Sequence, residues 1–249
     1  MEENNKNLTK NIKEKEIENI ESQENISQKN PEENLKAQKE KRKNNIKEAI
    51  EWIVCTIIAL IIVLTLKYYV AVPTVVRQSS MFPTLKDGER LLLNRTHRLD
   101  LNEIKKGDII TFEQPKVLFT KETADQNNAK AIYDDSKHST LYNFFYYVIE
   151  TPKVSFIKRI IGVAGDHIEI KDNKIFVNGT ELKEDYLPEN TQTKSEVFTD
   201  FIVPEGHIFA VGDNRDHSVD CREFGCIPLD KIEGTVICRF WPLNQISGF

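Results

Sequence analysis

One uncharged run constrains this chain more than any other feature. Fifteen residues from Trp52 to Leu66, WIVCTIIALIIVLTL, carry no charge and are nearly all apolar. A helix of that length spans about 22 Å, which is short of the roughly 30 Å of a bilayer core. Extension past Lys67 supplies the missing length, because a lysine side chain can reach toward the membrane interface. The sequence therefore predicts a transmembrane helix over residues 49–72.

Two other structures compete for this run. A buried core helix that is apolar on every face needs a larger protein around it than this chain offers. A cleaved signal peptide needs a short charged start and a small residue three positions before the cut. Here 51 residues precede the run, and Tyr69 occupies that position before Ala71. We therefore interpret the run as an uncleaved membrane anchor.

Residues 1–48 are densely charged but carry no net charge, and they contain no glycine, no aromatic residue and a single proline. Such a polar segment cannot bury enough apolar surface to offset the entropy that it loses on ordering. We therefore expect a disordered tail or a solvated helix. Its last part is basic, and basic residues beside an apolar helix indicate the cytoplasmic side. We expect a single-pass plasma-membrane protein with a cytoplasmic N-terminus. The basic residues are Lys36, Lys39, Lys41, Arg42, Lys43 and Lys47.

The remainder, residues 73–249, consists of short β-branched runs between turn sequences. Asp172-Asn173 and Asn178-Gly179 each suit a tight hairpin turn, and no long stretch shows helical periodicity. We predict a mainly β fold, with a β-rich extracytoplasmic domain behind a single N-terminal transmembrane helix. The expected strands are Arg90–Leu93, Asp108–Phe112, Val154–Gly162, His167–Ile170, Lys174–Val177, His207–Val211 and Thr235–Phe240.

Two neighbouring segments interrupt this pattern. Residues 122–140 have the composition of an inserted polar loop. The next run, Leu141–Ile149, packs five aromatic residues into nine positions. It is either a core strand or an exposed aromatic patch on the bilayer surface, and the sequence leaves both interpretations open.

The composition narrows the partners. A net charge of −5 does not favour a chain that binds nucleic acid through its overall field. Four cysteines are too few and too scattered for a disulfide scaffold, and they lack the paired spacing of a zinc site. Whether Cys221 and Cys226 form a disulfide stays open.

Three polar segments of the β-rich part could carry chemistry. In the first segment, around Ser80, the residue Pro83 stiffens the backbone, so Ser80 lies on a rigid turn or extended segment where it could act as a nucleophile. Serines in turns are common, so this residue alone is weak evidence for catalysis.

The last of the three segments along the chain, Gly212–Gly225, is too polar for a strand, and its side chains can hold an irregular loop.

The second segment contains adjacent basic residues, Lys158 and Arg159, within a β-branched run. On a strand their side chains point to opposite faces, which drives one of them toward apolar surroundings. Burial lowers the pKa of a lysine, and a neutral lysine is a competent general base. A shift from about 10.4 to about 7.5 requires roughly 4 kcal/mol of environmental bias. The competing interpretation is an edge-strand lysine that reaches into solvent.

Taken together behind the anchor, these segments resemble the bacterial type I signal peptidases, which are membrane-anchored serine proteases with a Ser/Lys dyad. Any one block is a weak signal, but four blocks in order at suitable spacings are a strong one. The resemblance extends from the anchor to the C-terminus. The matching blocks are Ser80-Met81-Phe82-Pro83-Thr84-Leu85, Gly107-Asp108-Ile109-Ile110, Lys158-Arg159 with Gly162, Gly165 and Asp166, and the stretch from Gly212 to Arg222.

The resemblance implies a role for each matching residue. Ser80 is expected to be the nucleophile and Lys158 the general base, with the backbone N–H of Ser80 as one oxyanion donor. Ser218 matches the residue that orients the lysine, and Asp220 and Arg222 match a supporting ion pair. Two positions depart from the family pattern. Cys221 replaces a serine, and Gln78 stands where relatives have Ser or Gly at the oxyanion hole.

The resemblance also implies a substrate. The expected enzyme removes N-terminal signal peptides from exported preproteins, after a small residue with another small residue two positions earlier, as in Ala-x-Ala. Shallow apolar pockets account for such selectivity, and the peptide is expected to bind as an added strand. The expected partners are preprotein signal peptides, the lipid bilayer and the protein export translocon. No cofactor, metal or nucleic acid is expected.

Other interpretations remain beside this one. Ser155 and Lys158 spell the S-x-x-K of penicillin-binding proteins, but that motif requires a helix. A triad that uses His167, His207 or His217 is not excluded by spacing. A self-cleaving repressor-type protease shares the dyad but lacks an anchor. From a different class, the chain could be a catalytically silent, membrane-anchored β-domain that binds secreted or envelope proteins, against which the intact Ser80 and Lys158 argue.

Overall fold

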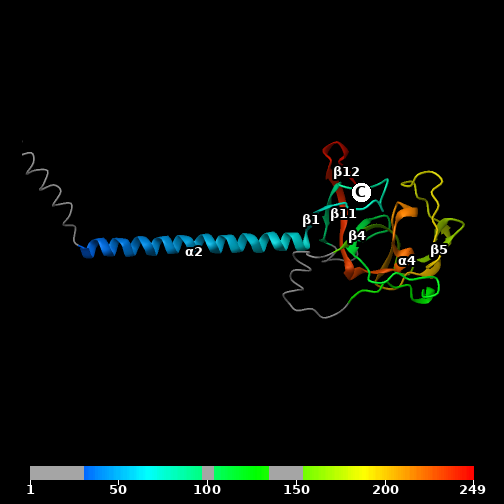
Figure 1. The fold of residues 1–249 in the computed structure, drawn as a ribbon, viewed down its shortest axis with the longest axis horizontal. Coiled ribbons are helices and arrows are strands. Elements are labelled where there is room, and N and C mark those ends of the chain that lie inside the picture. Colours follow the sequence, from blue (N-terminus) through cyan, green and yellow to red (C-terminus); the bar gives the residue numbers. More distant parts are fainter. Residues whose placement is uncertain (1–30, 97–103, 135–153) are drawn as a thin grey trace, which may run out of the picture. The chain divides into compact units, whose positions relative to one another are not determined.

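The computed structural model describes residues 31–96, 104–134 and 154–249. The chain forms two compact units, residues 1–61 and 62–249, and each is considered by itself. The first unit is helical in its described part, and the second contains all of the described β-structure. Figure 1 shows both.

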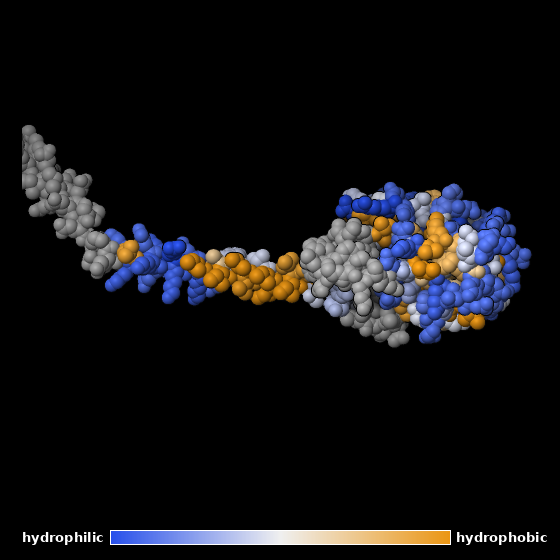
Figure 2. Space-filling view, turned by 60° about the horizontal axis from the view of Figure 1, so that its bottom comes forward, coloured by the Kyte–Doolittle hydropathy of each residue, from blue (hydrophilic) through white to orange (hydrophobic). Residues whose placement is uncertain are grey.

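Helix α2 extends from Pro31 to Tyr69 and is long and apolar enough to cross a membrane. In Figure 2 its charged first part is blue and the following apolar part forms a continuous orange band. The described side chains of the charged part are exposed, so residues 31–48 form a solvated helix, one of the two structures expected for them. Residues 1–30 lie outside the described residues.

The helix ends three residues before the expected boundary at Val72. Strand β1, Ala71–Val75, begins after a single intervening residue and pairs with Asn94–Arg90 of strand β2. Pairing with a neighbouring strand satisfies the backbone groups of residues 71 and 72, so the chain leaves the helix as soon as the sheet is in reach. Arg95 holds this junction, because its backbone N–H donates to Val70 O and its side chain to Lys67 O.

The larger sheet has the order β1-β2-β11-β3-β4-β9-β10, with β12 paired to β11, and the smaller sheet has the order β7-β6-β5-β8. All pairs of these named strands are antiparallel, which confirms the β-rich prediction. Strands β1 and β2 are followed by β3 Ile109–Glu113, β4 Ser155–Val163, β5 His167–Lys171, β6 Lys174–Val177, β7 Thr180–Glu181, β8 Asp200–Ile202, β9 His207–Val211, β10 Ile227–Pro228, β11 Ile232–Trp241 and β12 Ser247–Gly248.

The smaller sheet contains both predicted tight turns. Asp172 and Asn173 join β5 to β6 with φ values of +53° and +62°. Asn178 and Gly179 join β6 to β7 with φ values of +52° and +77°. Positive φ at both central residues is the geometry that two-residue hairpin turns favour, and Asn, Asp and Gly tolerate it best.

Short helices complete the second unit. Helix α4 comprises Cys221–Phe224, and its first turn is capped by the Asp220 carboxylate. In the described connections the 3-10 turns are η3 Gln126–Asn128, η5 Arg215–His217, η6 Leu229–Lys231 and η7 Leu243–Gln245.

The core consists of two clusters of buried side chains. The larger cluster lies between the two sheets and includes Phe112, Phe209 and Phe224. The smaller cluster packs β1 and β2 against β4 and includes Met81 and Leu85, which follow Ser80 in the chain. Burial of these two side chains therefore anchors the turn that carries Ser80.

The predicted polar insert is described only over residues 122–134. This part is fastened to the domain, because Lys130 forms a parallel bridge with Cys226 and the Gln126 side chain donates to Val197 O. Residues 135–140 and the aromatic run Leu141–Ile149 lie outside the described residues. The four cysteines are all free thiols, and Cys221 and Cys226 are buried.

The packing of Phe209 gives a direct test of the core. Its side chain is 0% exposed, and its ring centroid lies 5.1 Å from that of Phe201. We expect Phe209→Ala to lower the free energy of unfolding by about 3–5 kcal/mol, because the truncation leaves a cavity between the sheets. Urea unfolding of the purified protein in detergent measures this, with the exposed Ile202→Ala as control. Equal losses in both variants would contradict the assignment of the core.

Candidate active site

Ser80 lies on a compact turn after β1. The turn is closed by backbone hydrogen bonds from Phe82 N to Ser79 O, at 3.0 Å, and from Leu85 N to Met81 O, at 2.8 Å. The Ser80 carbonyl accepts a hydrogen bond from Asn214 N at 3.0 Å. Ser80 is 5% exposed, so its hydroxyl is held in a partly closed site rather than on a free loop.

Lys158 comes to Ser80 from strand β4, which lies between β3 and β9 in the larger sheet. Alternation along the strand sends Lys158 and Arg159 in opposite directions, as the sequence predicts. The Lys158 Nζ atom lies 2.9 Å from Ser80 Oγ and 3.1 Å from the carbonyl oxygen of Ile157. Two residues that are far apart in the sequence therefore meet as a hydrogen-bonded pair.

The surroundings of Lys158 disfavour its charged form. The residue is 1% exposed, and burial is the main cause that lowers the pKa of Lys158 from 10.5 to about 8. Arg222 lowers this pKa further, whereas Asp220 and Cys221 raise it. At a pKa of about 8 roughly a tenth of the lysines are neutral at pH 7, far more than for an ordinary lysine. The amine can therefore accept a proton near neutral pH.

Asp220 and Arg222 form a buried ion pair beside the dyad. Arg222 Nε donates to Asp220 Oδ1 at 2.8 Å, and Nη2 donates to Oδ2 at 2.9 Å. Gly212 N donates to the same carboxylate at 3.0 Å. Burial alone raises the pKa of Asp220, but the Arg222 guanidinium and these hydrogen bonds hold it below its ordinary value. The carboxylate therefore stays charged.

Ser218 is buried next to Gly212, and its hydroxyl makes no hydrogen bond of good geometry in the described part of the chain, although its approach to the Asp220 carboxylate helps to lower the pKa of that group. The hydrogen bonds of Lys158 Nζ go to Ser80 and to the Ile157 carbonyl, not to Ser218. The structure thus places Ser218 in the right segment without the expected contact to the lysine. Its orienting role stays a prediction.

Gln78 is exposed at the entrance of a cleft with a volume of about 620 Å³. The buried Ser80 and Lys158 both line this cleft, so a bound peptide can reach the dyad from solvent. Phe156 and Val219 provide apolar lining. The other described lining residues are Arg77, Ser79, Asp87 and His217.

A second buried ion pair was not predicted as part of the site. Arg159 donates to both carboxylate oxygens of Asp213, at 3.0 and 2.8 Å. Thr84 Oγ1 donates to the same carboxylate at 2.6 Å. This arrangement joins the strand of the lysine, the turn of the serine and the polar loop. All three residues lie in the sequence blocks singled out above, but only the fold shows which of them pair.

The rival serine motifs do not assemble. Ser155 and Lys158 lie on a strand rather than a helix, and Ser155 Oγ donates to Glu233 at 2.8 Å. His167 pairs with Asp200 on the smaller sheet, and His207 contacts the Glu205 carbonyl. Among the described histidines only His217 lines the cleft, and the hydrogen-bond partner of the Ser80 hydroxyl is Lys158.

Comparison with known proteins adds an independent finding. The family model described as "Signal peptidase, peptidase S26" matches residues 49–241. Signal peptidase I of Bacillus licheniformis is 32% identical over 215 residues, which cover 83% of this chain and 96% of that protein. Signal peptidase I T of Bacillus subtilis is 30% identical, with coverages of 79% and 88%. Signal peptidase IB of Staphylococcus aureus is 29% identical, with coverages of 81% and 94%.

The close contacts at Gly212 generate a prediction. A Cβ at this position would lie 2.1 Å from Ser218 Oγ and 2.5 Å from the backbone oxygen of Ser80. We expect Gly212→Ala to push these groups apart, to cost about 1–3 kcal/mol of stability, and to lower peptide cleavage at least tenfold. Gly248→Ala is the control, because a Cβ there meets nothing closer than 3.8 Å. Cleavage by Gly212→Ala at the control rate would contradict this packing.

Proposed function

Because the chain belongs to the S26 signal peptidase family and cleaves signal peptides from preproteins, we propose that Ser80 is its nucleophile and Lys158 its general base. The observation that carries the proposal is the 2.9 Å contact between the two side chains at a buried position. Burial keeps a share of the amine neutral, and the contact gives it a route to the serine proton.

The proposed reaction proceeds in two halves. Neutral Lys158 takes the Ser80 hydroxyl proton while the oxygen attacks the scissile carbonyl carbon, and a tetrahedral intermediate forms. The resulting ammonium gives this proton to the leaving amine as the peptide bond breaks, which leaves an acyl-serine. Water then attacks the acyl carbon while Lys158 takes one of its protons, and the lysine returns that proton to Ser80 Oγ as the acyl C–O bond breaks and the product carboxylate leaves.

The oxyanion requires hydrogen-bond donors that point at the developing charge. The backbone N–H of Ser80 is one proposed donor, and the Gln78 side-chain amide is a candidate for the second because Gln78 lines the same cleft. A donor of this kind is worth about 3 kcal/mol of transition-state stabilisation. Ser218 is proposed to orient Lys158, since a buried hydroxyl that makes no hydrogen bond of good geometry gains from one to the amine.

The cleft supports the proposed preference for small residues as in Ala-x-Ala. Phe156 and Val219 offer apolar walls beside the dyad, where a larger substrate side chain has to displace protein atoms. The peptide is proposed to bind in an extended form, so that main-chain hydrogen bonds provide affinity and the apolar walls provide selectivity.

We propose that α2 anchors the enzyme once in the plasma membrane, with the N-terminus in the cytoplasm and the β-rich unit outside. Support comes from the basic residues that precede the apolar part of the helix. This orientation places the active site on the side where preproteins emerge, so the export translocon is the proposed neighbour.

The dyad is tested by removing each side chain. We expect Ser80→Ala and Lys158→Ala each to reduce cleavage of a preprotein in detergent by at least a thousandfold, because the nucleophile or its base is lost. Circular dichroism should show both variants folded. Lys174→Ala, which removes an exposed lysine on the smaller sheet, is the matched control and should cleave normally. Normal processing by either dyad variant would reject the assignment.

The pH dependence tests the state of the lysine. Only neutral Lys158 can accept the serine proton, so kcat/KM should rise with pH and level off above the pKa of about 8. Burial lowers this pKa, which moves the rise down from the range of an ordinary lysine. A pH profile with a short signal-peptide substrate measures the midpoint of this rising limb of kcat/KM. A midpoint near 10.5 would show an amine in water and contradict the proposed base.

A further inference from the structure

The loop of residues 182–199 joins β7 to β8 of the smaller sheet. It contacts the stretch Gly212–Arg222, here called the active-site segment. The Lys194 carbonyl accepts from Arg222 Nη1 at 3.0 Å, and Ser195 Oγ donates to the Arg222 carbonyl at 3.3 Å. In Figure 1 this yellow segment runs beside the orange segment that contains α4. The loop therefore reaches the same arginine that pairs with Asp220.

Arg215 makes the strongest connection between the loop and the site. Its side chain is 0% exposed, and both terminal nitrogens donate to the Glu184 carboxylate. It also donates to Thr193 Oγ1 and, through Nε, to the Gly212 carbonyl at 3.1 Å. A buried guanidinium is stable only when its charge and donors are matched, and Glu184 supplies the matching charge.

Arg215 in turn determines the course of the active-site segment. Its backbone carbonyl accepts from Arg222 Nη2 at 2.8 Å, while its side chain holds the Gly212 carbonyl. Gly212 N donates to Asp220, and the neighbouring Asn214 N donates to the Ser80 carbonyl. The backbone that contacts the nucleophile and the charge nearest the lysine thus both depend on this side chain.

A second connection starts from the same carboxylate. Tyr186 Oη donates to Glu184 Oε1 at 2.6 Å, and its ring centroid lies 4.0 Å from the Arg159 guanidinium. Arg159 carries the ion pair with Asp213. Glu184 therefore contacts the active site through two side chains, Arg215 and Tyr186.

We propose that Glu184 is a positioning residue of the signal peptidase reaction, which aligns the Gly212–Arg222 segment with Ser80 and Lys158 by holding Arg215 and Tyr186. Glu184 touches no reacting atom and acts only through these two side chains. The inference rests on the roles proposed for Ser80 and Lys158.

Loss of the carboxylate has a specific consequence at Lys158. The guanidinium of Arg215 is left without its counter-charge and has to move or admit water, which loosens the segment around it. The titratable groups that act on Lys158 are Asp220, Cys221 and Arg222, and all three lie in that segment. Because burial is the main cause of the low pKa of Lys158, hydration of the segment moves this pKa up toward the ordinary lysine value.

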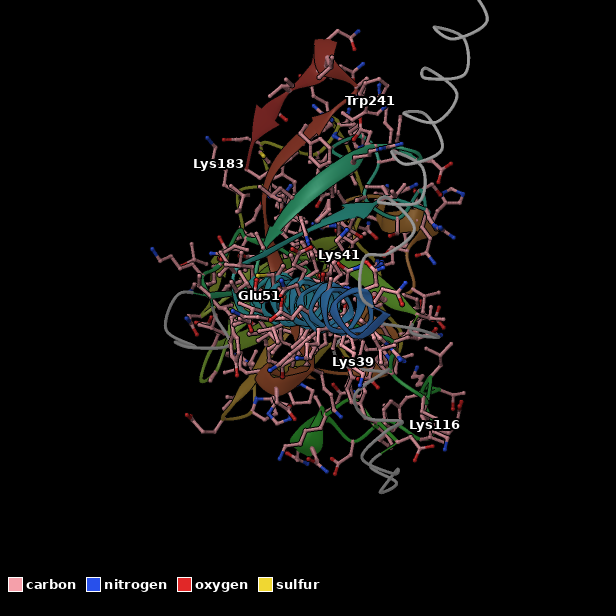
Figure 3. The ribbon with its side chains drawn as sticks, turned by 90° about the vertical axis from the view of Figure 1, so that its left-hand side faces the viewer. Lys39, Lys41, Glu51, Lys116, Lys183 and Trp241 are labelled. Carbon is pink, nitrogen blue, oxygen red and sulfur yellow. The ribbon has the colours of Figure 1, made fainter. Side chains whose placement is uncertain are left out.

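The test compares Glu184→Gln in the full-length enzyme with Asp185→Asn. Asp185 is the adjacent residue and carries the same charge. It pairs with Lys183 at the surface, where the Asp185 side chain is 75% exposed and the Lys183 side chain 84% exposed. Figure 3 shows Lys183 at the periphery of the domain. Cleavage of a signal-peptide substrate in detergent is measured as kcat and KM from pH 6 to 11.

For Glu184→Gln we expect kcat to fall ten- to a hundredfold, KM to change less than threefold, and the midpoint of the rising limb of kcat/KM to move up by at least half a pH unit. Asp185→Asn should match the wild type. A loss of folded protein lowers the rate at every pH alike and leaves the limb in place, so an unmoved limb overturns the proposal. An equal effect of Asp185→Asn overturns it as well.

A milder variant tests the same proposal if Glu184→Gln folds poorly. Thr193→Val is isosteric and removes one acceptor from the same guanidinium. It should lower kcat about threefold and shift the limb in the same direction, and a wild-type profile would count against the proposal. The wild-type limb itself tests the dyad, so failure of the dyad and failure of the Glu184 role are separately visible.

Discussion

The structure depends on the removal of one amine from water. Lys158 is placed in the middle of the larger sheet, where Phe156 and Ile160 on the same strand face and Ile110 across from it are apolar, and its amine meets the Ser80 hydroxyl. Burial costs free energy when the amine is charged and much less when it is neutral, so the fold itself favours the neutral state. The large core on both sides of β4 supplies the stability that tolerates such a residue.

Two other cations near the site are each matched by a carboxylate. Arg159 is matched by Asp213 and Arg222 by Asp220, each with two hydrogen bonds. Each of these guanidinium groups forms an ion pair with its own carboxylate, whereas the hydrogen-bond partners of Lys158 are neutral. Asp220 still raises the pKa of the lysine, and the Arg222 that is bound to it offsets that effect. Lys158 thus differs from Arg159 and Arg222 in having no carboxylate partner, and burial can act on its charge.

Local patterns allowed much of this to be predicted. The alternation in β4 placed Lys158 and Arg159 on opposite faces, and the Asp172-Asn173 turn joined β5 to β6 as expected. What the sequence could not provide is pairing over long distances. The partner of Arg159 is 54 residues away, and that of Arg215 is 31 residues away in a loop without any recognisable motif. Helix α2 ends at Tyr69 rather than at the expected Val72, because Ala71 and Val72 suit a helix and a strand equally well.

The short connection between α2 and the sheet constrains where the proposed dyad of Ser80 and Lys158 can work. Helix α2 ends at Tyr69, strand β1 begins at Ala71, and Ser80 follows nine residues later. Eleven residues of extended chain reach at most about 36 Å, and the turn after β1 shortens that reach. If α2 spans the bilayer, the nucleophile cannot leave the vicinity of the lipid surface. A substrate whose apolar segment is held in the same membrane is then confined to the same thin layer, which raises its effective concentration at the cleft without any additional contact.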